Sequence, residues 1–312
     1  MSKIAFLFPG QGSQYVGMCK DILEGVPRSR ELFFIAEEIA EIPITKLALE
    51  GPLEELTRTQ NLQPTLCAVD MAICIALEEK GIVPDTVAGH SLGEFPALWA
   101  CGALSAQDTF RLVKKRGQLM EEAGQKVSGS MAAIIGLSKD ELSKIIDDLR
   151  KRGEISLANH NSLEQIVITG EKPLIKEACK LVKEKGARAI PLKVSGPFHS
   201  PLMKDAAKEF ASLINEIEFL PPKVPIYSNV SAEAETDPLR IKELLSKQMV
   251  SPVRWYDTVI NMKDDGIDTF IESGPKKVLS NLVKKCLPSD ENIKIFQVED
   301  MNGIEKIYEI LK

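Results

Sequence analysis

Short apolar runs alternate with longer segments of helical periodicity through the first 125 residues. The opening run, Ile4 to Phe8, is typical of a buried strand and ends in a loop rich in turn formers, Pro9 to Gln14. We expect helices at residues 28–40, 65–80 and 105–123, and a short strand at 86–88. Pro64 and Gly81 bracket the second helix as start and stop signals. Strands that alternate with helices in this way predict a mostly parallel sheet covered on both faces.

The rhythm changes in the middle of the chain, where two strands follow each other without a helix between them. Ser138 and Glu141 form a capping box that opens a helix. We expect strands at 131–135, 155–158, 165–169 and 187–194, and helices at 138–151 and 173–185. This β-α-β-β-α-β order is typical of the ferredoxin-like split pattern.

After Pro197 the alternation of strands and helices resumes and continues to a C-terminal helix. We expect helices at 202–214, 239–248 and 255–263, strands at 224–227, 267–271 and 293–298, and one further helix between the last two strands. The chain therefore predicts an α/β fold with a large, mostly parallel sheet subdomain formed by residues 1–125 and 197–312. Residues 126–196 form a small ferredoxin-like α+β subdomain inserted into it.

Composition agrees with a globular protein and excludes several classes. The 312 residues are 44% hydrophobic and 27% charged, close to the average for soluble proteins, which argues against disorder and membrane-spanning folds. A net charge of -6 gives no overall attraction to nucleic acid or to anionic lipid. The first apolar run is too short for a signal peptide, and no stretch approaches the ~20 apolar residues of a membrane helix. We therefore expect a cytoplasmic protein that binds neither nucleic acid nor a membrane.

The six cysteines are scattered along the chain, without a C-x-x-C motif or a cluster of cysteine and histidine. This spacing predicts neither a zinc site nor a disulfide framework. Cys67 and Cys74 lie seven residues apart, which is typical of two small apolar side chains on one helix face.

A serine lies in a pattern associated with nucleophiles. Gly89-x-Ser91-x-Gly93 follows an expected strand and precedes an expected helix, which is the context of a nucleophile elbow. Glycine is needed at both positions because a side chain would crowd the turn or the substrate. The backbone N–H of Leu92 would point into the same space and could stabilise an oxyanion. The alternative is a simple turn, because so short a pattern also occurs by chance. With the elbow, the large subdomain is expected to be hydrolase-like.

A serine nucleophile also needs a base, and the chain has three histidines. His90 is adjacent to Ser91, and neighbours on a tight turn generally point apart. His160 ends an expected strand, where a core or surface role is the better interpretation. His199 lies in the non-regular segment 195–201, and its place after the serine matches the chain order of α/β serine hydrolases. We prefer His199, although these arguments leave the pairing open.

One arginine occupies a position where a charge is unexpected. In the helix at 105–123, Arg116 falls in the centre of an apolar stripe formed by Leu112, Val113, Leu119 and Met120. A buried arginine needs an anionic partner. An internal salt bridge would satisfy it. The alternative is a planar fork aimed at a substrate carboxylate, and an acyl-transfer serine favours this second interpretation.

Six motifs spread over essentially the whole chain carry a resemblance to a known family. They are residues 8–14 (FPGQGSQ), 89–94 (GHSLGE), 131–133 (MAA), 158–162 (ANHNS), 196–200 (GPFHS) and 272–275 (ESGP). In this order and spacing the chain resembles the malonyl-CoA:acyl carrier protein transacylases of bacterial fatty acid synthesis. The resemblance implies transfer of a malonyl group from malonyl-CoA to the phosphopantetheine thiol of acyl carrier protein through a malonyl-serine intermediate. It implies no metal and no redox cofactor, and we expect a monomer.

The resemblance also implies roles for the residues at the matching positions. Ser91 would be the acylated nucleophile and His199 its base. In the family a backbone carbonyl orients the histidine, and Gln248 occupies that place here. Gln11 and Leu92 would supply the backbone N–H groups of the oxyanion hole.

Three further residues match positions that bind the substrate. Arg116 would hold the malonyl carboxylate, and Asn161 would lie close to the site. Phe198 is similar to the malonyl-selective form of the family, where the methylmalonyl-selective form usually has serine. The chain departs from the family at Pro96, where a small residue is usual. A proline at this point removes one backbone N–H, and we expect it to affect the geometry of the helix behind the elbow.

Two rival functions fit parts of the sequence. A thioesterase or esterase could use a similar elbow, but Arg116 and the Gln11 loop argue against it. A catalytically inactive acyl-binding or scaffold domain is disfavoured because Ser91, His199 and Arg116 are all present.

Overall fold

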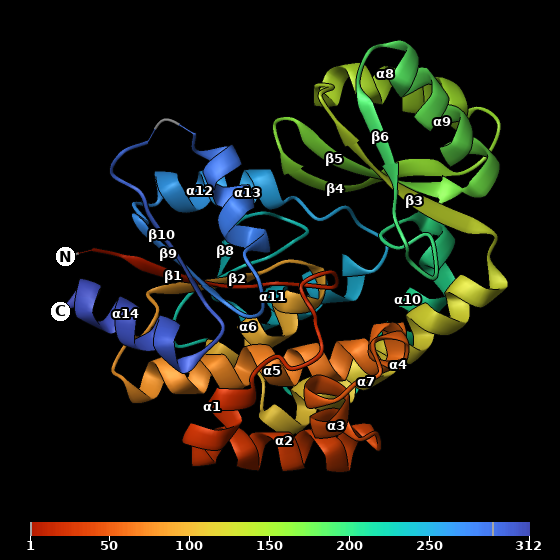
Figure 1. Cartoon of the computed structure of the whole chain (residues 1–312). Helices are drawn as coiled ribbons and strands as arrows, with labels where there is room; N and C mark the ends of the chain where they lie inside the picture. The colour runs from red at the N-terminus through yellow and green to blue at the C-terminus, as the bar shows by residue number, and fades with distance from the viewer. Residues whose placement is uncertain (1, 289) are drawn as a thin grey trace.

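The computed structural model describes residues 2–288 and 290–312, which form two separate sheets with their covering helices (Figure 1). The larger sheet has the strand order β10-β9-β1-β2-β7-β8, and all neighbours are parallel except β7 and β8. Its strands are β1 (Ile4–Phe8), β2 (Thr86–Gly89), β7 (Ile226–Tyr227), β8 (Ala234–Glu235), β9 (Thr269–Ser273) and β10 (Lys294–Val298). This mostly parallel sheet confirms the architecture predicted for the large subdomain.

Strand β1 lies near the centre of the larger sheet and is buried on both faces. Phe6 and Phe8 belong to one hydrophobic cluster, whereas Ala5 and Leu7 belong to another that includes Trp255. Figure 1 shows α12 (Trp255–Asp264) and α13 (Val278–Cys286) on one face, and α5 (Thr59–Glu79) and α6 (Glu94–Ala100) on the other. The remaining helices of this part are α1 (Lys20–Gly25), α2 (Pro27–Ala40), α3 (Ile44–Leu49), α4 (Leu53–Thr57), α7 (Ala106–Lys126), α10 (Lys204–Glu216), α11 (Pro238–Gln248) and α14 (Met301–Leu311). Every side chain of strand β1 is therefore apolar, because helices cover both faces of the sheet at this strand.

The second sheet is antiparallel and has the strand order β4-β5-β3-β6. It consists of β3 (Gly129–Ile135), β4 (Ile155–Ser162), β5 (Gln165–Glu171) and β6 (Arg188–Pro191), with α8 (Lys139–Arg150) and α9 (Lys172–Glu184) as its helices. Numbered from the first of these strands, the order is 2-3-1-4, the ferredoxin-like arrangement that the sequence predicted. The limits given for the two subdomains, 126–196 and the rest, stay predictions.

The small sheet has one face toward its own helices and one toward the large subdomain. Along β3, Ala132 and Ile134 pack in the cluster of α8 and α9, whereas Met131 and Ala133 join the main core. Residue Asn159 of β4 forms a parallel bridge with Val253, a residue just before α12. These contacts hold the small sheet over the end of the large sheet where β2 runs into the elbow.

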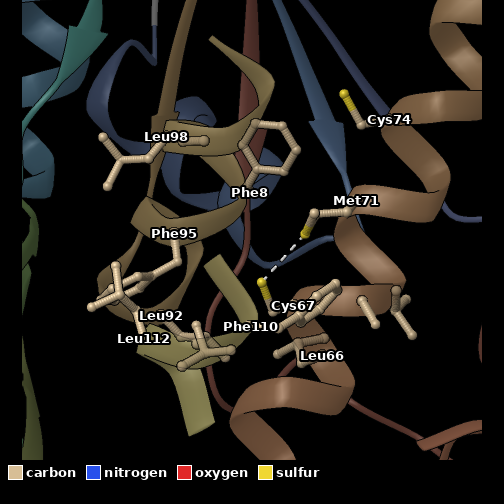
Figure 2. Packing of buried hydrophobic residues seen from close by; sticks show 14 of the residues in the cluster. Phe8, Leu66, Cys67, Met71, Cys74, Leu92, Phe95, Leu98, Phe110 and Leu112 are labelled. Atoms are coloured by element: carbon tan, nitrogen blue, oxygen red, sulfur yellow. Dashed lines mark hydrogen bonds between the residues drawn. The ribbon is translucent and has the colours of Figure 1, made fainter. Parts of the chain in front are cut away.

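The helices behind the elbow share a closely packed core. Figure 2 shows Phe8, Leu92, Phe95 and Phe110 around Cys67 of α5, whose thiol contacts the sulfur of a methionine one turn further along. All six cysteines are free, and Cys67 and Cys74 are fully buried on α5. Burial raises the pKa of the Cys67 thiol well above its usual value, so it stays a neutral apolar group.

The first part of the chain differs from the prediction in two respects. Helix α5 begins at Thr59 rather than near residue 65, so Pro64 lies inside the helix. Proline removes a backbone donor there, but residues 61–66 are buried, and their packing outweighs the local cost. The short helices α1, α3 and α4 were not predicted, since five or six residues are too few to show a helical period.

Pro96 does not interrupt the helix behind the elbow. It is the third residue of α6, in the first turn, where backbone N–H groups have no partner within the helix. The proline therefore removes a donor that the helix does not use. In the part of the chain that the structure describes, no helix combines the length and the apolar character needed to cross a membrane.

Candidate active site

Ser91 lies on a sharp turn between β2 and a 3₁₀ turn that leads into α6. Its backbone φ is +54°, in the left-handed region that side chains other than glycine seldom adopt. A Cβ on Gly89 would overlap the carbonyl of Gly93, and a Cβ on Gly93 would overlap the carbonyl of Phe8. Both glycines are therefore required because the turn closes on itself and against β1, the context that a nucleophile elbow needs.

Asn229 braces this turn from the loop after β7. Its Oδ1 accepts a hydrogen bond from the Ser91 backbone N–H at 2.7 Å, and its Nδ2 donates to the carbonyl of Gly89 at 2.6 Å. The side chain therefore mimics a neighbouring strand and holds both ends of the strained turn. Sequence reasoning missed Asn229, because no local pattern marks a residue that acts 138 positions away.

The structure brings Ser91 and His199 together. The distance from Ser91 Oγ to His199 Nε2 is 2.7 Å. On the other side of the ring, Nδ1 lies 3.1 Å from the carbonyl oxygens of both Gln248 and Ser251. Two carbonyl acceptors favour the tautomer with a proton on Nδ1, which leaves Nε2 free to accept the serine proton. Ser251, which follows α11, was not found from the sequence.

The other two histidines make contacts elsewhere. His90 Nε2 is 2.8 Å from Asn161 Oδ1, and the His90 ring meets that of Trp255 edge-on with centroids 5.6 Å apart. The His160 ring lies 5.0 Å from that of Tyr256. Of the three histidines, His199 is the one within hydrogen-bond distance of Ser91.

His199 is held in its neutral form. Burial first, and then the nearby positive charge of Arg116, lower the pKa of His199 to about 3, although the two carbonyl contacts oppose the shift. At neutral pH the imidazole is therefore unprotonated, as a base must be before it accepts a proton.

Arg116 of α7 is 1% exposed and lies beside the serine. Its guanidinium donates to Gln63 Oε1 at 2.9 Å, to Gln248 Oε1 at 2.9 Å and to Ser91 Oγ at 3.1 Å. Among the described residues, all the hydrogen-bond partners of this cation are uncharged. Arg116 therefore does not form the internal salt bridge that was one of its two predicted roles. Neutral acceptors hold the guanidinium, and its charge remains available to an anionic ligand.

The charge state of Arg116 follows from its surroundings. Burial lowers the pKa of its guanidinium to about 10, and the buried carboxyl group of Glu94 opposes this shift. The guanidinium carbon also lies 5.4 Å from the centre of the Phe95 ring, a favourable cation–π arrangement. Arg116 thus stays positively charged at neutral pH.

A cavity of about 110 Å³ opens onto these groups. Its lining residues include Gln11, Ser91, Leu92, Arg116, Phe198 and His199. An adjoining cavity of about 390 Å³ shares Gln11 and His90 with it and is also lined by Asn161 and Gln165. The structure therefore brings most of the sequence-predicted residues to one small cavity, whereas Asn161 lies at the neighbouring one.

The Gln11 loop lies tightly against the elbow. A Cβ on Gly10 would overlap the carbonyl of His90 and would lie 3.7 Å from the backbone nitrogen of Leu92. Within the described residues, the backbone N–H groups of Gln11 and Leu92 donate to no other group of the chain. Both residues line the cavity beside Ser91, so their backbone N–H groups are candidates for binding an oxyanion.

Two more side chains at the site were missed by sequence reasoning. Gln63 lies in the part of α5 that was not expected to be helical, so its position opposite Arg116 could not be predicted. Glu94 belongs to the same motif as Ser91 and is 3% exposed, but no role was assigned to it. No group of three or more His, Cys, Asp or Glu side chains among the described residues could hold a metal ion.

Comparison with known proteins gives consistent matches over the full chain. A family model described as "Acyl transferase domain" matches residues 5–301. A Bacillus subtilis protein named malonyl CoA-acyl carrier protein transacylase is 46% identical, with 100% of this chain and 98% of that protein covered. A Haemophilus influenzae protein of the same name is 40% identical, with 98% of this chain and 99% of that protein covered.

Solved structures are similar over the same extent. The crystal structure of an acyl carrier protein S-malonyltransferase from Vibrio cholerae has a TM-score of 0.93 and 40% identity, with 98% of this chain and 100% of that chain covered. A second structure, described as a type II PKS acyl-carrier protein in complex with its malonyl-transacylase, has a TM-score of 0.94 and 36% identity. This match covers 99% of the present chain and 100% of the malonyl-transacylase structure's chain.

Substitution of the second elbow glycine should destabilise the protein. We expect Gly93→Ala to lower the free energy of unfolding by about 1–3 kcal/mol, because the added methyl group has to displace the backbone of β1. Urea denaturation measures this change. Gly25→Ala is the matched control, since its Cβ would meet only the Met301 side chain at 3.9 Å. Equal unfolding free energies for the two variants would contradict the close packing of the elbow.

The low pKa of His199 predicts a pH-dependent loss of stability. In the unfolded chain the imidazole takes up a proton near its ordinary pKa of 6.5, whereas the folded protein resists protonation down to about 3. The contribution of neutral His199 to the free energy of unfolding is therefore complete above pH 6.5. It declines as the pH falls from 6.5 toward the pKa of the folded protein. Between about pH 7.5 and pH 5, the unmodified protein should lose about 2 kcal/mol more than His199→Asn.

Asparagine suits this test because it tolerates the left-handed backbone of residue 199, where φ is +57°. All other titratable groups are common to both proteins, so their effects cancel in the difference. Urea denaturation at several pH values supplies the two curves. Parallel curves would show that His199 is not held neutral by its surroundings.

Proposed function

This chain belongs to the malonyl-CoA:acyl carrier protein transacylase family of acyltransferases, and on that basis we propose that Ser91 carries the malonyl group between its donor and its acceptor. The enzyme transfers malonyl from malonyl-CoA to acyl carrier protein in fatty acid synthesis. The observation that carries the assignment of residues is that Ser91 Oγ lies 2.7 Å from a neutral histidine nitrogen and 3.1 Å from a buried arginine.

In the first half of the cycle, His199 Nε2 takes the proton of the Ser91 hydroxyl as Oγ forms a bond to the thioester carbon. The negative charge that develops on the carbonyl oxygen is stabilised by the backbone N–H groups of Gln11 and Leu92. The tetrahedral intermediate then breaks its carbon–sulfur bond, and coenzyme A leaves as a thiol with the proton from His199. Malonyl-Ser91 remains.

The second half repeats these steps in reverse. The phosphopantetheine thiol of the carrier protein gives its proton to His199 and attacks the ester carbon. The bond to Ser91 Oγ breaks, and the serine recovers its proton. The backbone carbonyls of Gln248 and Ser251 orient the imidazole through Nδ1 in both halves, in place of the carboxylate of a catalytic triad.

Arg116 selects the malonyl group through its terminal carboxylate. In malonyl-Ser91 this carboxylate lies two bonds beyond the acyl carbon, and the guanidinium is already within hydrogen-bond distance of Oγ. Among the described residues, the direct hydrogen-bond partners of this buried cation are all neutral, which supports the role because the substrate carboxylate would be its charged hydrogen-bond partner. Phe198 lines the same cavity as Arg116, and Asn161 lines the adjoining cavity.

Exchange of an acyl group among two thiols and a hydroxyl neither oxidises nor reduces the substrate, so we propose that no cofactor takes part. The partners are malonyl-CoA and the carrier protein that bears phosphopantetheine. A single chain supplies every group in this cycle, which supports a monomer as the working unit. The net charge of -6 supports the expectation that nucleic acid is not a partner.

Loss of the nucleophile should abolish covalent loading. Intact mass spectrometry after mixing with malonyl-CoA should show one malonyl adduct on the unmodified protein and none on Ser91→Ala. The exposed Ser212 provides a control, since Ser212→Ala should be labelled normally. An adduct that persists in Ser91→Ala would sink the assignment of the nucleophile, and rapid release of free malonate would indicate a hydrolase.

Arg116→Ala should change substrate preference rather than abolish activity. Truncation of one partner in a buried charge pair costs about 2–5 kcal/mol. This corresponds to a loss of about 30-fold to several thousand-fold in kcat/KM for malonyl-CoA. Acetyl-CoA has no carboxylate to lose a partner, so its kcat/KM should hold or rise.

The test compares kcat/KM for the two substrates on the folded variant. Arg111→Ala is the matched control, because Arg111 lies on the same helix but is exposed and paired with Asp108. That variant should keep the malonyl preference of the unmodified enzyme. An unchanged ratio in Arg116→Ala would refute a carboxylate-binding role for Arg116.

A further inference from the structure

The side-chain amide of Gln248 uses all of its hydrogen-bonding groups. Its Oε1 accepts from Arg116 at 2.9 Å, and its Nε2 donates to the Ser91 carbonyl at 2.9 Å and to Glu94 Oε2 at 2.6 Å. The amide therefore lies directly between a buried cation and a buried carboxyl group. Its orientation decides whether Arg116 meets an oxygen or an NH₂ group.

Glu94 lies in the first turn of α6, three residues after Ser91, and is not used in the transfer steps. Its Oε2 accepts from Gln248, and its Oε1 accepts from the backbone N–H of Asn229 at 3.2 Å. Burial raises the pKa of Glu94 to about 7, and these hydrogen bonds and Arg116 oppose the rise. An ionised carboxylate can only accept hydrogen bonds, so it requires a donor from each neighbour.

We propose that Glu94 is a positioning residue for malonyl selection, acting through Gln248 on Arg116. Because the carboxylate accepts only, the Gln248 amide has to turn its NH₂ group toward Glu94 and its oxygen toward Arg116. This orientation supplies one of the two amide acceptors that hold the guanidinium, the other being Gln63. The inference rests on the proposed role of Arg116 in binding the malonyl carboxylate.

Replacement of Glu94 by glutamine removes this constraint while it preserves size. Three groups that donate to the carboxylate, the Asn229 N–H, the Gln248 NH₂ group and the Ser228 hydroxyl, then face a side chain with only one acceptor oxygen. If the glutamine oxygen accepts from the Asn229 N–H, the new NH₂ group at residue 94 faces the NH₂ group of Gln248, and two donors are in contact. A rotation of the Gln248 side-chain amide by about 180° would remove this conflict. Its NH₂ group would then face the guanidinium, and Arg116 would lose an anchor.

The charge of Glu94 acts in the opposite direction. A carboxylate near Arg116 repels the malonyl carboxylate, so its removal by itself would favour malonyl binding. The contacts that join Glu94, Gln248 and Arg116 are direct hydrogen bonds of 2.6 and 2.9 Å in a buried site. Hydrogen bonds to charged groups are about twice as strong as neutral ones, and we therefore expect the loss of orientation to exceed the gain from reduced repulsion.

The experiment measures kcat/KM for malonyl-CoA and for acetyl-CoA at about pH 8.5, above the raised pKa of about 7 for Glu94, so that the carboxyl group is ionised. In Glu94→Gln the ratio of malonyl to acetyl efficiency should fall roughly tenfold to hundredfold, the range for loss of one hydrogen bond to a charged group. Glu94→Asp keeps an acceptor-only carboxylate and should restore part of the ratio. Thermal unfolding of each variant checks that the fold is intact.

A double-variant cycle separates action through Gln248 from general support of the elbow. Gln248→Met keeps the length of the side chain and the backbone carbonyl beside His199, but it removes the amide. This variant should itself lose malonyl preference, which keeps the test open if Glu94→Gln does not fold. In the Gln248→Met background, Glu94→Gln should cause no further fall in the ratio.

Three results would overturn the proposal. In folded Glu94→Gln the ratio could stay unchanged, which includes an equal loss for both substrates; the ratio could rise; or the two substitutions could lower the ratio additively. Failure of the proposed function would look different, because Arg116→Ala would then leave the ratio unchanged. A lower ratio in Arg116→Ala together with an unchanged ratio in Glu94→Gln would reject the role of Glu94 alone.

Discussion

A single buried positive charge organises the site. Removal of the Arg116 guanidinium from water is costly unless acceptors replace the water, and two glutamine oxygens and the serine hydroxyl do so. These acceptors come from the first half of α5, from the end of α11 and from the elbow. Helix packing in the large subdomain therefore has to be correct before the charge can be buried, which links the stability of this region to the geometry of the site.

The same charge affects both halves of the proposed chemistry. It lies within hydrogen-bond distance of the Ser91 oxygen, where it can stabilise negative charge and hold a substrate carboxylate. Burial is the larger cause that lowers the pKa of His199, and the charge of Arg116 adds to it, so the base stays neutral beside a cation. Carbonyl oxygens on Nδ1 suit this setting, because they orient the imidazole without bringing a carboxylate that would pair with Arg116 and compete with the substrate.

The sequence predicted the parts of the fold that depend on local regularity. Periodicity identified the central strands, the long helices and the β-α-β-β-α-β order, and the glycines around Ser91 predicted a turn that only residues without a Cβ can form. The apolar stripe around Arg116 marked a buried cation. The prediction that the helix begins near residue 65 was wrong. Local propensities treat Pro64 as a helix start, but packing against neighbouring helices lets the helix extend back to Thr59.

Tertiary structure decided which of these groups meet. Ser91 and His199 are separated by 108 residues and Arg116 and Gln248 by 132, and no local pattern relates residues so far apart. For the same reason the sequence could name Arg116 as a buried cation but could not name Gln63 as its partner. Asn229 and Glu94 contact the site through hydrogen bonds between segments that are distant in sequence. Their contributions therefore depend on how α6, α11 and the loop after β7 pack together, which the sequence alone does not specify.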